Sequence, residues 1–132
     1  MTLIVDASIA VKWLLEEEGS DEARRAVQGH DLAAPAFLRL EVFHVVWRRS
    51  RRGEATRSQL QDTLPALSKI IGRFEHDETL IAKAADIAAA QTLAIYDCLY
   101  LALAVQDAAT LITADEKQLA TARRLRIETR TI

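Results

Sequence analysis

The sequence contains a single cysteine, Cys98, among its 132 residues. One cysteine cannot form an internal disulfide bond, and it cannot supply the cysteine pairs that hold a structural zinc ion. Cys98 also lies in an apolar stretch, which is typical of a buried thiol. We therefore expect a protein of a reducing compartment, the cytoplasm. The single cysteine argues against a secreted disulfide scaffold and against a zinc cluster.

Long hydrophobic runs and a strong positive charge are missing as well. No apolar stretch approaches the roughly 20 residues of a membrane-spanning helix. The first residues lack the basic segment of a signal peptide, and Asp6 soon interrupts their apolar run. The formal net charge is −2, which excludes a generally basic nucleic-acid coat. We expect no membrane contact, and any contact with nucleic acid must come from a local patch.

The motifs of several enzyme classes are also absent. The chain has no GxxxxGK[ST] loop to cradle phosphates and no GxGxxG turn for a dinucleotide. No serine or cysteine stands in a pattern with a histidine that would serve acyl transfer. These absences argue against nucleotide-binding and acyl-transfer functions.

What remains is the composition of an ordinary globular domain, with 50% hydrophobic and 27% charged residues. A chain of this length can bury roughly two thirds of its unfolded surface without help from disulfides. We therefore expect one compact domain over residues 1–132.

Short apolar segments alternate with helical patterns along this domain. Strands are expected at residues 3–5, 32–34, 73–75 and 110–113, with an edge strand at 127–129. Helices are expected at residues 9–15, from 20 toward 29, and at 36–51, 56–71, 78–92, 96–107 and 115–125. Pro65 should start, kink or break the helix in which it falls. This alternation predicts an α/β fold in which helices cover both faces of a parallel sheet.

Two acidic residues follow predicted strands, Asp6 directly and Asp115 shortly after. The carboxyl ends of parallel strands share one edge of the sheet, where the functional sites of open α/β folds gather. Each acid could instead cap the following helix. For Asp115, paired with Gln118, capping is the stronger interpretation when the residue is taken alone. For Asp6 it is weaker, because Ser8 is expected to cap the first helix.

Two further acids interrupt apolar helices. Asp97 is the lone charged residue between positions 94 and 105, and apolar residues surround Glu41 on both sides. A carboxylate in such a place costs several kcal/mol unless it is paired, capping a helix or bound to a metal. Asp97 could be stabilised by the helix dipole, and Glu41 could pair with Arg39 or Arg48.

The four acids together favour a metal site. Two carboxylates at ~4 Å repel by about 4 kcal/mol even at an effective dielectric constant of 20, and a bound cation removes that repulsion. Carboxylates without histidine clusters or cysteine pairs select Mg²⁺ or Mn²⁺. Such a site suits the attack of water on a phosphodiester bond.

The same residues lie in segments that closely resemble the PIN-domain family, and more narrowly the VapC-type toxins of toxin–antitoxin pairs. The resemblance spans essentially the whole chain, with the motifs in the family's order and spacing. The segments are Val5-Asp6-Ala7-Ser8, Leu40-Glu41-Val42, residues 96–104 around Asp97, and Leu111-Ile112-Thr113-Ala114-Asp115-Glu116.

The resemblance implies a three-layer α/β/α sandwich and Mg²⁺- or Mn²⁺-dependent cleavage of RNA. It further implies a homodimer and a cognate antitoxin that inserts into the acidic groove. Asp6, Glu41, Asp97 and Asp115 would be the catalytic, metal-binding acids, and the hydroxyl groups of Ser8 and Thr113 would support them.

Two positions depart from the family's pattern. His44 stands where an asparagine is frequent, and Ala94 stands where a serine or threonine often caps the helix. His44 is expected to support the site as a partner of a carboxylate, although it could equally be an ordinary helix histidine. Ala94 weakens the local cap but leaves the metal-binding interpretation unchanged.

Basic and aromatic residues offer a local surface for RNA. Arg48, Arg49, Arg51 and Arg52 cluster near Gly53, and a second basic cluster lies near the C-terminus. Both clusters could bind an RNA backbone or could be solvated helix ends. Trp13 and Trp47 fall on apolar helical stripes, and we expect both in the core.

The alternative from another class is a protein-interaction module without catalytic activity, either a degenerate PIN-like domain or a receiver-like domain. A receiver requires paired acids after its first strand and a lysine after its last, and the sequence has neither. A degenerate PIN-like domain would have lost an acid, whereas all four are present.

Overall fold

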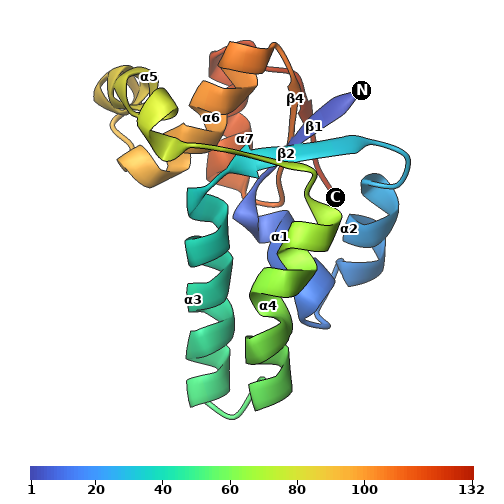
Figure 1. Ribbon diagram of the computed structural model, residues 1–132. Coiled ribbons are helices and arrows are strands. Elements are labelled where there is room, and N and C mark those ends of the chain that lie inside the picture. The colour runs from blue at the N-terminus through green and yellow to red at the C-terminus, as the bar shows by residue number, and fades with distance from the viewer.

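A computed structural model describes residues 1–132 as a five-stranded, all-parallel sheet with the strand order β3-β2-β1-β4-β5 (Figure 1). The strands are β1 (Thr2–Val5), β2 (Asp31–Pro35), β3 (Arg73–Glu75), β4 (Thr110–Ile112) and β5 (Thr129–Arg130). The predicted α/β class and parallel sheet are therefore confirmed. The edge strand β5 begins two residues later than expected.

Seven helices connect and cover the strands. They are α1 (Ala7–Leu14), α2 (Ser20–Ala26), α3 (Phe37–Arg51), α4 (Arg57–Ile70), α5 (Asp77–Gln91), α6 (Ile95–Asp107) and α7 (Glu116–Arg124). Helices α1 to α4 lie on one face of the sheet and α5 to α7 on the other (Figure 1). This arrangement is the three-layer sandwich that the family resemblance implies.

The direction of winding changes between β1 and β4, which are neighbours at the centre of the sheet. The chain moves outward from β1 through β2 to β3, then returns across the sheet to β4 and continues to β5. In the register, Val5 pairs with Ile112, so both strands end at the same level. Ligand sites of open α/β sheets form at such switch points, beyond the carboxyl ends of the strands.

Strands β1 and β4 form because their residues are apolar and are buried on both faces. Leu3, Ile4, Val5, Leu111 and Ile112 are completely inaccessible to solvent. Helix α6 packs across these strands and is buried from Cys98 to Ala104, which confirms the expected buried thiol. By itself, no helix is long and apolar enough to cross a membrane; only α5 and α6 taken together, with a bend of 115° between them, reach that length and composition.

Helices α3 and α4 form a hairpin that projects away from the sheet (Figure 1). Gly53 allows the tight turn through a positive φ of 74°, and Thr56 caps α4 in a reciprocal capping box with Gln59. Helix α4 continues through Pro65 as one element. Pro65 is exposed, so the carbonyl group that it leaves without a helix partner can bind water.

The projection of the hairpin also corrects one core prediction. Trp13 is half-buried against the core, and its Nε1 donates to the carbonyl oxygen of Ala23. Trp47 is 42% exposed, because the outer half of α3 extends beyond the core and has little to pack against. It stacks on His44 and lies beneath the guanidinium of Arg51.

Candidate active site

Asp6 lies at the end of β1 and is held by two hydroxyl groups. The hydroxyls of Ser8 and Thr113 donate to its Oδ2 at 2.6 and 3.0 Å. Each hydroxyl oxygen also accepts a backbone N–H from the turn after β4, from Ala114 and Asp115 respectively. The predicted hydroxyl contacts of Ser8 and Thr113 are therefore present, and they connect Asp6 to the neighbouring strand.

Asp6, rather than Ser8, is the N-cap of α1. The backbone N–H of Ser8 donates to Asp6 Oδ2 at 3.3 Å, so the expectation that Ser8 caps this helix is wrong. The helix already begins at Ala7, which places Ser8 inside its first turn. Capping engages only Oδ2, and Asp6 Oδ1 has no hydrogen bond within the chain.

Asp115 follows β4 and caps α7. Its Oδ1 accepts the backbone N–H groups of Lys117 and Gln118 at 2.8 and 3.2 Å. The capping interpretation of Asp115 is thus confirmed, but the reciprocal box is not, because the Gln118 side chain turns away from the cap. Asp115 Oδ2 remains free of hydrogen bonds within the chain.

Asp97 lies in the first turn of α6, and its carboxylate accepts no hydrogen bond. Instead, its backbone carbonyl accepts the buried side-chain amide of Gln118 at 2.8 Å. Gln118 therefore joins the start of α6 to the start of α7, the two places that carry Asp97 and Asp115. The side chain of Asp97 is half-buried and has no cationic partner.

Glu41 projects from α3 toward the buried Tyr100 of α6. The Tyr100 hydroxyl donates to Glu41 Oε1 at 2.6 Å. Neither of the arginines considered as partners reaches this carboxylate. Arg39 lies over the ring of Phe74, and Arg48 is exposed without an ion pair.

The four acids lie near enough to influence one another's protonation. Burial raises the pKa of Glu41 to about 7, and Asp6, Asp97 and Asp115 add to this rise, while the Tyr100 hydrogen bond opposes it. Burial, followed by the charge of Asp115, raises the pKa of Asp97. Burial also raises the pKa of Asp6 against the opposing hydrogen bonds of Ser8 and Thr113. The site thus concentrates negative charge where solvent screens it poorly.

The donor atoms fit a hard divalent cation by their chemistry. Asp6, Glu41 and Asp115 each have one carboxylate oxygen that accepts no hydrogen bond. In Asp97, neither carboxylate oxygen accepts one. As the side chains stand, however, no three of these residues are close enough to hold one ion together. Mutual repulsion favours such separation, and the N-cap role of Asp115 engages one of its oxygens.

The remaining predicted residues lie along α3. His44 is exposed, stacks on Trp47 with ring centroids 6.0 Å apart, and has no hydrogen bond to the four acids. Arg49 is bound to Glu17 at 2.7 Å. Arg48, Arg51 and Arg52 are exposed and line, with Trp47, an open depression of about 280 Å³.

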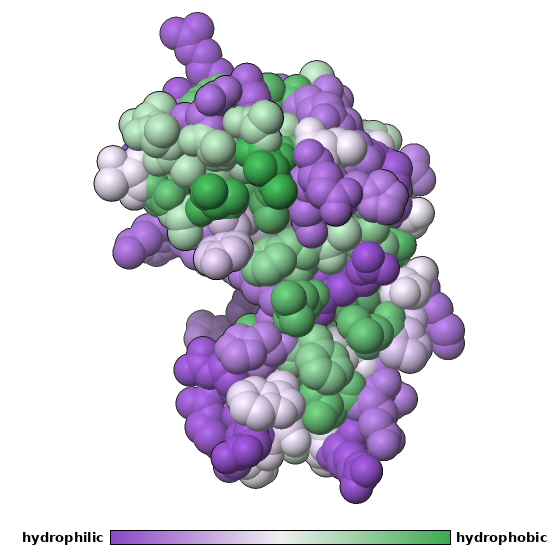
Figure 2. All heavy atoms as spheres, turned by 60° about the vertical axis from the view of Figure 1, so that its left-hand side comes forward, coloured by the Kyte–Doolittle hydropathy of each residue, from purple (hydrophilic) through white to green (hydrophobic).

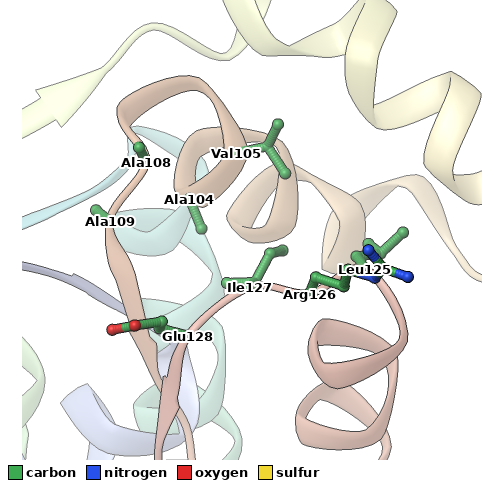
Figure 3. A pocket seen from close by; sticks show the side chains of 8 residues that line it. All are labelled: Ala104, Val105, Ala108, Ala109, Leu125, Arg126, Ile127 and Glu128. Atoms are coloured by element: carbon green, nitrogen blue, oxygen red, sulfur yellow. The ribbon is translucent and has the colours of Figure 1, made fainter.

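A cavity of about 360 Å³ lies away from the acids, where α6 ends and the chain leaves α7 (Figure 3). Its walls are mostly alanine and aliphatic side chains, including Val105 and Ile127, and Glu128 is its one acid. The cavity lacks the convergent polar groups of a catalytic site. The acid cluster therefore remains the candidate active site.

Tyr100 and Gln118 belong to this site, but the sequence did not single them out as members of it. The spacing of Tyr100, three residues after Asp97, places both on one side of α6 and could have indicated its involvement. Its contact with Glu41 joins residues 59 positions apart, which no local pattern reveals. For Gln118, the sequence predicts only a place in the capping box with Asp115.

A parallel sheet with four acids near its switch point is also found in a known protein family, which comparison of the sequence with family models identifies. The PIN domain family model matches residues 3–124. The chain belongs to the PIN-domain family, as its motifs predict. It is 32% identical over 120 residues to the ribonuclease VapC3 of Pyrobaculum aerophilum, a match that covers 89% of this chain and 92% of that protein.

Solved structures agree on the fold. VapC20 of Mycobacterium tuberculosis, described as a toxin that cleaves the sarcin–ricin loop, superposes with a TM-score of 0.72 at 17% identity, covering 89% of this chain and 93% of that one. A toxin–antitoxin complex from Klebsiella pneumoniae gives a TM-score of 0.68 at 21% identity, covering 89% and 90%.

Proposed function

We propose that this protein is a divalent-metal-dependent endoribonuclease and the toxin of a toxin–antitoxin pair. One observation carries the catalytic part of this proposal. Asp6, Glu41, Asp97 and Asp115 come from four separate elements to one edge of the sheet, and none of them takes part in any of the chain's ion pairs. A bound cation stabilises uncompensated carboxylates in a partly buried cluster. The family and the ribonuclease relative point to RNA as the substrate.

Asp6, Glu41, Asp97 and Asp115 would together hold Mg²⁺ or Mn²⁺ through the oxygens that carry no hydrogen bond. When bound, the ion supplies activation of a water molecule and compensation of the charge on the leaving oxygen.

The RNA strand would reach these acids along α3. Arg48 is exposed two turns after Glu41 on the same side of this helix, and the exposed Arg51 and Arg52 follow at its end. Arg49 drops out of the predicted RNA-binding set because the partly buried Glu17 binds it at 2.7 Å, whereas the ion pair of Arg52 with Glu54, at 3.7 Å, is exposed to solvent and weak. Lysine and arginine side chains in such positions bind phosphates irrespective of sequence.

A protein partner would cover the apolar surface of the α3–α4 hairpin. Leu40 and Leu64 are 64% and 44% exposed, and with Phe43 they line an open groove of about 330 Å³ between the two helices. Figure 2 shows apolar side chains continuing down the hairpin between hydrophilic margins. We propose that this surface serves homodimerisation and lies beside the acidic groove that the antitoxin enters. A toxin acting on cellular RNA would work in the cytoplasm.

The Asp97→Asn variant tests the catalytic proposal. It preserves the shape of the side chain but removes the charge that would bind the ion. We expect cleavage of RNA in Mg²⁺ or Mn²⁺ to fall by roughly a hundredfold or more, the loss typical of a removed electrostatic contribution in an active site. The measurement is the rate of cleavage of a defined RNA by the purified protein, with EDTA abolishing the activity.

The matched control is Asp86→Asn, which removes an exposed, unpaired acid from the adjacent α5. It should cleave RNA at the wild-type rate. Equal rates for Asp97→Asn and wild type would remove Asp97 from the catalytic set. A wild-type protein that cleaves no RNA but binds its antitoxin would favour the inert interaction module.

A further inference from the structure

The buried hydroxyl group of Tyr100 has one partner, and that partner belongs to the acid cluster. Tyr100 is 1% exposed, and its hydroxyl donates to Glu41 Oε1 at 2.6 Å. Three residues before it, on the same side of α6, lies Asp97. Helix α6 therefore contributes one carboxylate of the cluster and the group that holds a second carboxylate, which α3 carries.

From this geometry we propose that Tyr100 is a positioning residue, which fixes the Glu41 carboxylate in the orientation required for binding a divalent cation. The inference rests on the proposed function, in which the four acids hold such an ion. Tyr100 touches neither the ion nor the RNA in this role. It acts through Glu41 alone.

The chemistry of a phenol suits this task better than that of a basic residue. An arginine or lysine bound to Glu41 would neutralise its charge and compete with the cation. A neutral hydroxyl group satisfies one oxygen, stays in place because the ring is packed in the core, and leaves the charge and Oε2 available. Glu41 has several rotatable bonds and would otherwise lose more rotamer freedom on binding an ion. The hydrogen bond removes part of that cost in advance, which is the usual effect of a partner behind a metal ligand.

The Tyr100→Phe variant removes only the hydroxyl oxygen and keeps the ring that fills the core. We expect the affinity for Mn²⁺, measured by calorimetry on the RNA-free protein, to fall by about tenfold, as for other groups that orient a metal ligand. The rate constant kcat for RNA cleavage should fall while KM changes little, because Tyr100 lies away from the RNA. The matched control is Tyr96→Phe, which makes the same change one turn earlier in α6, at an exposed ring without a hydrogen bond.

A double-mutant cycle separates positioning from general stability. In a Glu41→Gln background the ligand charge is already lost, so Tyr100→Phe should weaken Mn²⁺ binding no further. A purely structural role for Tyr100 predicts the same loss of affinity in both backgrounds. That result, or wild-type affinity in Tyr100→Phe itself, would overturn the proposal.

A spectroscopic measurement keeps the proposal testable even where Tyr100→Phe folds poorly. The chain has two tyrosines, so Tyr96→Phe leaves Tyr100 as the only one. Ultraviolet resonance Raman spectra of that protein should show a strong hydrogen-bond donor, and the signal should change to that of a free or hydrated phenol after Glu41→Ala. A spectrum unaffected by Glu41→Ala would contradict the contact itself.

These outcomes are distinguishable from a failure of the proposed function. If the wild-type protein binds Mn²⁺ but cleaves no RNA, the loss of Mn²⁺ affinity in Tyr100→Phe would still support the positioning role. If Tyr100→Phe cleaves RNA and binds Mn²⁺ like the wild type, the positioning role fails and the ribonuclease proposal stands.

Discussion

The side chain of Asp115 has two roles, one in capping a helix and one in the electrostatics of the acid cluster. Its Oδ1 caps α7, while its charge raises the pKa of Asp6, Glu41 and Asp97. The cap stabilises the fold and the charge destabilises it in the absence of a cation. Substitutions that retain one property and remove the other can therefore tell the two apart.

We predict opposite effects for Asp115→Asn and Asp115→Ala in EDTA. Asparagine caps helices about as well as aspartate, so Asp115→Asn should melt at the wild-type temperature or higher because repulsion is relieved. Asp115→Ala loses the cap and should be less stable by about 1 kcal/mol. Thermal melts of both variants, with EDTA and with Mn²⁺, make the comparison.

The gain in stability on adding Mn²⁺ shows whether Asp115 takes part in binding the cation. A cation at a hundredfold excess over Kd stabilises the folded wild type by roughly 2.7 kcal/mol, and both Asp115 variants should gain less. Thr56→Ala is the matched control, because it removes the cap of α4 far from the acids and should leave the gain intact. An undiminished gain in Asp115→Asn would exclude Asp115 from the cation site.

Glu41 gives a prediction for pH. Its pKa rises on folding from 4.5 to about 7, so the folded protein binds more protons than the unfolded chain between these values. Its contribution to stability is therefore fully present below about pH 4.5 and is lost as the pH rises through about 7. We expect the stability of metal-free wild type to decline across this range more steeply than that of Glu41→Gln. Denaturant unfolding in EDTA at several pH values checks this, and equal slopes would contradict it.

At the scale of elements, the helices and central strands could be predicted from periodicity. The apolar runs of β1 and β4 and the long helices α3 to α6 are visible because burial imposes a pattern on them. The prediction of a helix start was wrong where the sequence offers two residues that could cap the helix. Asp6 and Ser8 can both cap a helix, and a shift of two residues in its start decides between them.

The wrong prediction that Trp47 lies in the core has a different cause. Its position on an apolar stripe indicates only that α3 has such a face, and not whether another element covers it. The contact between Tyr100 and Glu41 could not be predicted either, because it depends on how α3 and α6 pack against each other. The four acids could be found from the sequence since each one disturbs a local pattern. Their distances could not, because those depend on the packing of the whole sheet.

At the scale of the molecule, the exposed hairpin surface predicts self-association. The purified protein should form a homodimer at micromolar concentrations, and Leu40→Asp should shift it toward the monomer by placing a charge in the apolar groove. Val105→Asp is the control, because Val105 is 40% exposed, close to the 44% of Leu64 in the groove, but borders the separate cavity at the end of α6 (Figure 3). Light scattering measures both. A strictly monomeric wild type, with and without antitoxin, would refute the prediction.

The adjacency of β1 and β4 has a consequence for how the protein is made. Asp6 is synthesised 107 positions before its hydrogen-bonding partner Thr113, and Asp115 follows Thr113 by two residues. A nascent chain therefore cannot assemble the acid cluster until every residue through Asp115 has left the ribosome and β4 has paired with β1. An enzyme that cuts RNA through these acids would thus stay inactive while the segment between them is being synthesised, and an antitoxin need meet it only after that point.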